Sequence, residues 1–208
     1  MLDVFPLLWD KSVNSKSNPK QQYACVVLVN YLLTKTEVKL FRAPDTEHGM
    51  PIEVKNYVES IKTDLFNITD DRVETLCNAL MQSNNLDRYP TEREVKEGVC
   101  KKGERRDKFT DLRMNLVEIL SCMIRVREET ISKIGGGTWK HLVRWFHDHH
   151  SNDIYHCLFF QIFSNVLQHG DDVCLKKAIG NSKLLLDLIR RLLELKKDLE
   201  KGVPLKVG

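Results

Sequence analysis

Apolar residues recur at helical spacing along most of the chain, and the alternation typical of strands is almost absent. Leu112, Leu116 and Ile119, for example, fall on one face of a helix with 3.6 residues per turn. Thr110 and Asp111 precede this run and form a typical helix start, because a short polar side chain satisfies the free N–H groups there. The pattern predicts an all-α fold, with about eight to ten helices.

Other helices are predicted by the same rules. Asn18-Pro19 begins a helix that is apolar nearly all round, so we expect it to lie centrally. Pro51 begins a second helix, and Thr69 followed by two acidic residues predicts the start of a third. Towards the end of the chain we expect an apolar helix from Asn152 to Leu167 with Gly170 as its C-cap, and a leucine-rich helix from Leu184 to about Leu199.

A similar block of sequence occurs twice, at residues 131–146 and 174–189. Each copy runs from a short amphipathic turn through a glycine break into an apolar helix, and Leu142 falls opposite Leu185 about 43 positions later. A period of about 40–47 residues is typical of armadillo and HEAT arrays. We therefore predict one armadillo/HEAT-like right-handed superhelical domain over residues 1–208, with a charged, exposed insertion at about 84–108. An irregular helical bundle is the alternative.

Composition narrows the function only slightly. The chain has 208 residues and a net charge of +3, which does not predict nucleic-acid binding. We expect no bilayer span and no signal peptide, because no long apolar run is present and the first residues lack a basic segment. The six cysteines include no CxxC pair and mostly follow apolar helical patterns, which favours free thiols in a reducing compartment. We expect a cytoplasmic protein, with a nuclear location also compatible.

Two clusters suggest chemistry at first sight. Five histidines lie between His141 and His156, but they have neither an HExxH motif nor a cysteine pair, so a helix-end role is the better interpretation than a zinc site. Gly135–Gly137 lacks the lysine and the preceding strand of a phosphate loop, and it favours a sharp turn between helices. We expect no metal, no cofactor and no catalytic residues.

One family resemblance is carried by residues 110–180. Leu116-Val117-Glu118-Ile119-Leu120, then Leu142-Val143-Arg144-Trp145-Phe146, then Asn152-Asp153-Ile154-Tyr155-His156 resemble, in this order, motifs of the SAPS-domain proteins. Those proteins are regulatory subunits of protein phosphatases related to type 2A. Their motif has Asn-Asn-x-x-His, and this chain has Asp153 at the second position. The resemblance implies a helical array that binds a phosphatase catalytic subunit.

We therefore predict a non-enzymatic scaffold that binds a type 2A-like phosphatase catalytic subunit. The alternative is an armadillo-type adaptor for a small GTPase, a cytoskeletal or motor protein, or a peptide, and an all-helical enzyme is a third hypothesis. Trp139 is expected at a helix start, where it is either partly exposed for a partner or packed in the core. The residues expected to bind a partner are Trp139, Arg144, Asn152, His156, Asn165, Lys101, Lys102, Arg105 and Arg106.

Overall fold

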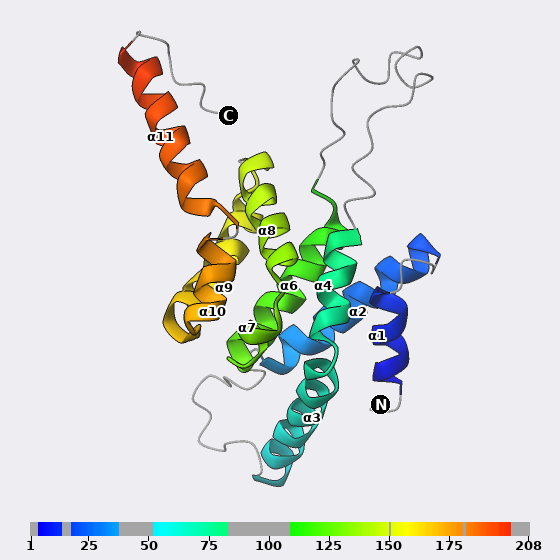
Figure 1. Ribbon diagram of the computed structural model, residues 1–208. Helices are drawn as coiled ribbons and strands as arrows, with labels where there is room; N and C mark the ends of the chain where they lie inside the picture. Colours follow the sequence, from blue (N-terminus) through cyan, green and yellow to red (C-terminus); the bar gives the residue numbers. More distant parts are fainter. Residues whose placement is uncertain are drawn as a thin grey trace, which may run out of the picture.

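The computed structural model describes residues 4–13, 18–37, 52–82, 109–149, 151–180 and 182–200. Nearly all of these residues lie in helices, and none of them forms a strand, so the predicted all-α class is confirmed (Figure 1). The helices are α1 (Phe5–Val13), α2 (Pro19–Glu37), α3 (Ile52–Asp70), α4 (Val73–Gln82), α6 (Asp111–Val126), α7 (Thr130–Lys133), α8 (Gly136–Asp148), α9 (Asp153–His169), α10 (Asp172–Leu175), the π-helical turn η2 (Lys176–Gly180) and α11 (Leu184–Glu200).

Side-chain caps fix where several helices begin. The side-chain oxygen of Asn18 accepts a hydrogen bond from the backbone N–H of Lys20 at 3.0 Å, and Thr110 accepts one from Arg113 at 3.4 Å. Asn152 caps α9 in the same way. Each cap satisfies one of the free N–H groups of a first turn. These starts agree with the sequence prediction.

The start predicted at Thr69 is wrong, because Thr69 and Asp70 belong to the last turn of α3. The Thr69 side chain is buried and its hydroxyl donates back to the carbonyl of Phe66 at 3.0 Å. This hydroxyl bonds to a carbonyl of the helix that Thr69 ends. Thr69 therefore does not cap the first turn of the next helix. The next helix, α4, begins at Val73.

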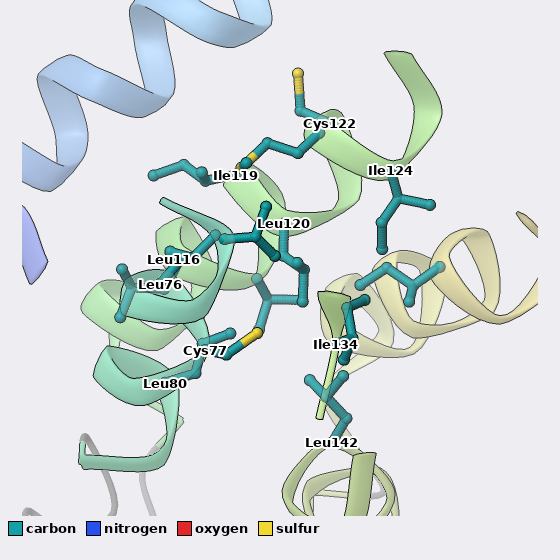
Figure 2. Close-up of a cluster of buried hydrophobic side chains, with 14 of the residues drawn as sticks. Leu76, Cys77, Leu80, Leu116, Ile119, Leu120, Cys122, Ile124, Ile134 and Leu142 are labelled. Carbon is teal, nitrogen blue, oxygen red and sulfur yellow. The ribbon is translucent and has the colours of Figure 1, made fainter. Parts of the chain in front are cut away.

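Helix α6 is the centre of the fold, with α2, α3, α4, α7 and α9 packed around it. Figure 2 shows part of this core, in which apolar side chains of α4 and α6 meet near Leu120, with Ile134 and with Leu142 of α8 beside them. We expected α2 to lie centrally because it is apolar nearly all round, and the structure leaves part of its apolar surface exposed. Only one face of α2 is buried, through residues such as Val26 and Leu33, whereas Tyr31 is exposed. Helices α1, α3 and α6 all pack against α2.

The two similar blocks have similar local structure. In the first, α7 is followed by a break at Ile134–Gly135 and then by α8; in the second, α10 and η2 are followed by a break and then by α11. The blocks also touch, since α7 contacts α10 and α8 contacts η2. Their burial differs, because Leu142 is buried whereas the corresponding Leu185 is exposed. A superhelical array therefore stays a prediction.

The expected charged insertion at about 84–108 lies outside the described residues. Within the described part of the chain, no helix is long and apolar enough to cross a bilayer.

Candidate partner-binding surface

The corner between α8 and α9 is built by the residues of the Asn152–His156 motif. The side chain of Asn152 accepts a hydrogen bond from the backbone N–H of Tyr155 at 3.0 Å. His156 Nε2 lies 3.2 Å from the carbonyl oxygen of Phe146, and the two rings stack with their centroids 4.6 Å apart. Because a carbonyl only accepts, His156 carries its proton on Nε2 in this contact. The motif therefore fixes the direction in which α9 leaves α8.

Tyr155 ties the same corner to the core. Its side chain is fully buried, and its hydroxyl donates to the carbonyl of Leu142 at 2.6 Å. Burial raises the pKa of the Tyr155 phenol well above its ordinary value. Its ring lies against Phe109 and Trp145, at centroid distances of 4.5 and 6.3 Å. The buried guanidinium of Arg113 lies 5.2 Å from the centroid of the Trp145 ring. Trp145 is itself buried, so it belongs to the core, as predicted.

The expectation that Trp139 contacts a partner is wrong, since its side chain has no exposed surface. The three glycines before it explain this: Gly135 is the N-cap of α8, so Trp139 already lies one turn inside the helix. At that position it faces the core together with Leu142 and Val143. Of the two interpretations of Trp139, core packing is the one observed.

The other predicted residues have varied surroundings. Arg144 is exposed and forms an ion pair with Asp148 one turn later, with 3.8 Å between Nε and a carboxylate oxygen. The amide of Asn165 donates to the carbonyl of Gln161 within α9, at 2.8 Å. Asn152 and His156 are half-buried and already bonded in the corner. The four predicted basic residues Lys101, Lys102, Arg105 and Arg106 lie outside the described residues.

An open pocket of about 400 Å³ lies between α8 and α11. Lys140, Arg144 and Arg190 contribute positive charge to its lining, and Asp148 and Asp187 contribute negative charge. On α11, a guanidinium nitrogen of Arg190 lies 3.1 Å from a carboxylate oxygen of Asp187, so this helix carries an ion pair as α8 does. The lining is thus mainly a mixed-charge surface with Val143 as an apolar member, which is suited to polar contacts with a peptide or protein.

A row of exposed side chains on α9 was missed by the sequence analysis. Ile154, Phe160 and Leu167 are 67%, 54% and 53% exposed, and Cys157 lies between the first two and is also exposed. Ile154, Cys157 and Phe160 are spaced three residues apart and Leu167 lies two turns beyond Phe160, so the four form an outer strip that spreads over the side of α9 opposite the buried face with Phe159 and Ile162. The sequence contained a signal for this strip, because the segment of α9 is apolar on more than one face. A helix that buries only one face needs apolar residues on that face alone.

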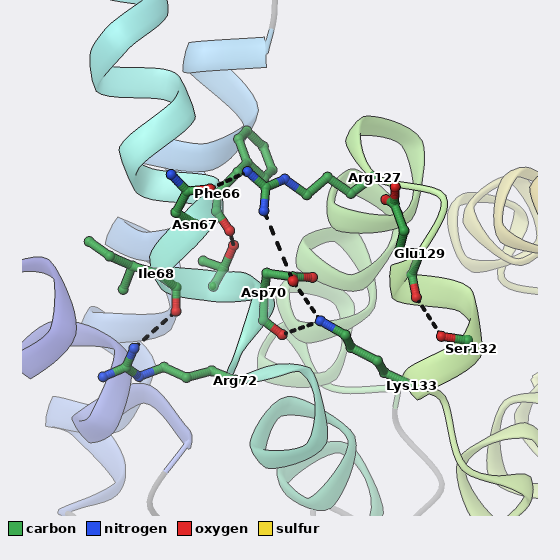
Figure 3. Close-up of polar contacts among 10 residues, drawn as sticks. Phe66, Asn67, Ile68, Asp70, Arg72, Arg127, Glu129, Ser132 and Lys133 are labelled. Atoms are coloured by element: carbon green, nitrogen blue, oxygen red, sulfur yellow. Dashed lines mark hydrogen bonds and ion pairs between the residues drawn. The ribbon is translucent and has the colours of Figure 1, made fainter.

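A polar cluster joins the last turns of α3 to the C-cap of α6 and to α7 (Figure 3). The ammonium of Lys133 lies 2.5 Å from a carboxylate oxygen of Asp70, and a guanidinium nitrogen of Arg127 lies 4.0 Å from the same atom. Arg127 also donates to the side-chain oxygen of Asn67 at 2.5 Å. The ammonium of Lys133 also donates to the backbone carbonyl of Asp70 at 3.2 Å. The cluster therefore ties the end of α3 to α6 and α7, while the second carboxylate oxygen of Asp70 is buried and has no hydrogen-bond partner among the described residues.

Histidines and cysteines among the described residues are possible metal ligands by residue type. No group of three or more His, Cys, Asp or Glu side chains is placed to hold a metal there. The ring of His141 instead bonds the carbonyl of Gly137 at 2.9 Å, inside its own helix. Desolvation raises the pKa values of Cys77 and Cys174, and so keeps both thiols protonated.

Comparisons of this chain with known proteins found no match. No family model matches the chain, and neither a curated protein nor a solved structure matches it.

Proposed function

We propose that this chain is a non-enzymatic helical scaffold that binds another protein, as a regulatory subunit of a type 2A-like serine/threonine phosphatase. The resemblance to the SAPS-domain proteins supports the choice of partner. The motif residues that carry this resemblance, among them Asn152 and His156, have a folding role in the α8–α9 corner. They therefore support a similar architecture, and the contact surface must come from other residues.

The observation that carries the proposal is the outer strip of α9, made of Ile154, Cys157, Phe160 and Leu167. Apolar side chains that are more than half exposed and aligned on one helix are costly in water and mark interaction sites. Phe160 has the aromatic character that is common at the centre of interfaces. It is also held in place, because its ring lies 5.5 Å from that of Phe146. The strip is thus an apolar ridge on a firmly anchored helix.

Helical scaffolds bind through extended surfaces of this kind and need no deep pocket. The open pocket between α8 and α11 supplies polar groups at a second place, with Lys140 and Arg144 on one wall. An interface of apolar centre and polar surroundings is the usual arrangement between proteins. The catalytic groups would then belong entirely to the bound phosphatase subunit.

The test is a direct binding measurement between the purified chain and a purified type 2A-like catalytic subunit. We expect saturable binding, and the double variant Ile154→Asp/Leu167→Asp should weaken it at least about tenfold, because two charges replace apolar contacts. Leu7→Asp is the matched control, since Leu7 is equally exposed but lies on α1. Circular dichroism at 222 nm checks that all three chains are folded.

Absence of binding by the unaltered chain would overturn the choice of partner. An adaptor for a peptide is the second candidate, and the mixed-charge lining of the α8–α11 pocket favours it. In that case, partners recovered from an extract should lack phosphatase subunits, and Arg144→Glu should reduce their binding more than the strip variant does.

A further inference from the structure

Helix α11 carries a row of apolar side chains that are exposed to solvent. Beyond its first turn the helix extends away from the other helices (Figure 1). The apolar side chains recur at steps of three and four residues, so they form one continuous face that covers about a third of the helix circumference. Their exposed fractions lie between 51% and 65%, and the residues are Leu185, Leu186, Ile189, Leu192 and Leu193.

The rest of the protein lies behind this face. Leu184, in the first turn of α11, is buried, and Asp187 lines the pocket that α11 shares with α8. Both residues stand about 140–160° from the middle of the apolar face, counting 3.6 residues per turn. Leu188, which packs partly against the core, stands about 100° from it. A flat surface can therefore lie along the apolar face without meeting the sides of α11 that pack against the protein.

Positive charge borders the apolar face. Lys197 and Arg190 are exposed and stand about 80° and 100° from its middle, on the same edge, and Lys196 lies at its C-terminal end. Arg190 pairs with Asp187 at 3.1 Å and Lys196 with Glu200 at 3.9 Å, and such exposed pairs are weak enough to exchange partners. Long basic side chains at the edge of an apolar face extend outwards and keep their charges in the polar layer when the face is buried.

The distribution of charge along the whole chain favours the same end. Residues 183–208 contain seven basic and four acidic residues, a net charge of +3, whereas residues 1–182 contain 25 basic and 25 acidic residues. The excess positive charge of the chain therefore belongs entirely to the segment that contains α11. A negatively charged surface attracts this segment and exerts no net attraction on the remainder.

We propose that α11 lies in the plane of an anionic phospholipid bilayer, with Ile189 at the centre of the face that enters the acyl boundary. A helix with an aliphatic face and basic residues along its edge is suited to this interface, which requires no matching shape. The sequence of α11 contains no aromatic residue, the type that is common at the centre of protein interfaces. This inference is independent of the proposed function, because α9 carries the other surface.

The apolar face is short, so the binding is reversible. Leu185 to Leu193 cover about two and a half turns, and a face of this size gives modest affinity unless charge attraction adds to it. The proposal therefore makes two separate demands. Binding requires the apolar face, and it requires anionic lipid.

Cosedimentation of the purified full chain with vesicles tests both demands. Vesicles of about 70% phosphatidylcholine and about 30% phosphatidylserine should bind the chain at least about tenfold more strongly than phosphatidylcholine alone, and about 0.5 M salt should remove most of this difference. Ile189→Asp should weaken the binding at least about tenfold, because a charge enters the middle of the face. Leu7→Asp is the matched control, since Leu7 is 63% exposed on α1, and it should bind as the unaltered chain does.

Charge variants test the basic edge. Lys196→Gln/Lys197→Gln should weaken binding to the phosphatidylserine vesicles by about tenfold or more and change binding to phosphatidylcholine little, because each lysine near an anionic surface adds to the attraction. Lys11→Gln/Lys20→Gln is the matched control, since it removes two exposed lysines from α1 and α2, and it should weaken binding by less than about threefold. Circular dichroism checks that every variant is folded.

A tryptophan on the face reports whether it enters the bilayer. The native Trp9, Trp139 and Trp145 are buried in the protein, so lipids carrying bromine in their acyl chains should quench the fluorescence of Ile189→Trp and leave that of Leu7→Trp unchanged.

An unaltered chain that binds neither kind of vesicle would overturn the proposal, and dimerisation of that chain would assign the face to a second copy. Equal loss of binding in Ile189→Asp and Leu7→Asp, or no quenching of vesicle-bound Ile189→Trp, would show that binding does not use this face. Equal binding to both kinds of vesicle would overturn the requirement for anionic lipid.

Discussion

Removal of the buried hydroxyl of Tyr155 tests whether the α8–α9 corner is held as described. Tyr155→Phe keeps the ring among Phe109, Trp145 and Phe159 but deletes the 2.6 Å hydrogen bond to the carbonyl of Leu142. That carbonyl belongs to a helix and keeps its place in the backbone ladder, so little is left unsatisfied. At pH 7 we expect the variant to lose about 1 kcal/mol in the free energy of unfolding.

The same substitution has a pH dependence with a definite sign. Burial raises the pKa of Tyr155 in the folded protein, whereas in the unfolded chain it is near 10. Above pH 10 the unfolded phenol therefore ionises while the folded one stays protonated, which favours unfolding of the unaltered protein by about 1.4 kcal/mol per pH unit until the folded pKa is reached. The Tyr155→Phe variant has no ionisable group at this position, so it does not lose unfolding free energy in this way. The stability advantage of tyrosine, complete below pH 10, should vanish near pH 11 and then reverse.

Urea unfolding of both proteins, followed by circular dichroism from about pH 7 to 11, measures the difference in unfolding free energy. The difference in unfolding free energy between the two proteins cancels the titration of the lysines and of the other tyrosines, because both chains contain them. Tyr57→Phe is the matched control at pH 7, because Tyr57 is 68% exposed and its change should stay within about 0.5 kcal/mol. A difference between tyrosine and phenylalanine at position 155 that is the same at pH 7 and pH 11 would refute a buried, protonated phenol.

Two other substitutions separate folding roles from binding roles. Trp139→Ala should lower the free energy of unfolding by about 3–5 kcal/mol in urea, since a fully buried ring is removed, whereas Lys140→Ala beside it should change it by less than about 0.5 kcal/mol. Asn152→Ala should cost about 1 kcal/mol by removing the cap of α9, and Asn152→Asp should retain most of it, as measured by thermal unfolding. Equal stability of the two Asn152 variants would contradict the capping role.

Most of the helical architecture was predictable from local sequence. Pro19, Thr110, Asn152 and Gly170 mark helix ends in the structure as they do in the sequence, because caps and proline act through the backbone of one turn. The wrong prediction at Thr69 also concerns a single turn. A threonine hydroxyl can bond either to the helix before it or to the helix after it, and the sequence does not show which carbonyl or N–H group is within reach.

Side-chain exposure could not be predicted in the same way. For Trp139 the sequence left both partner contact and core packing open, and the side chain is buried; the apolar helices α2 and α9, by contrast, expose part of their apolar surface. Helical spacing states which residues share a face, but it does not state how many other helices cover that face. The candidate surface on α9 depends on how many helices cover each face of α9, so only the packing of the helices revealed it.

By itself, the sequence determined that this protein is all-helical, where several of its helices begin and end, and that two of its segments are alike. Only the tertiary structure decided that the two segments have different surroundings: α8 is packed against α4, α9 and η2, whereas α11 rests on η2 by its first turn. The physical reason is that local propensity and capping are properties of neighbouring residues in the chain, while burial depends on which distant helices arrive at each face.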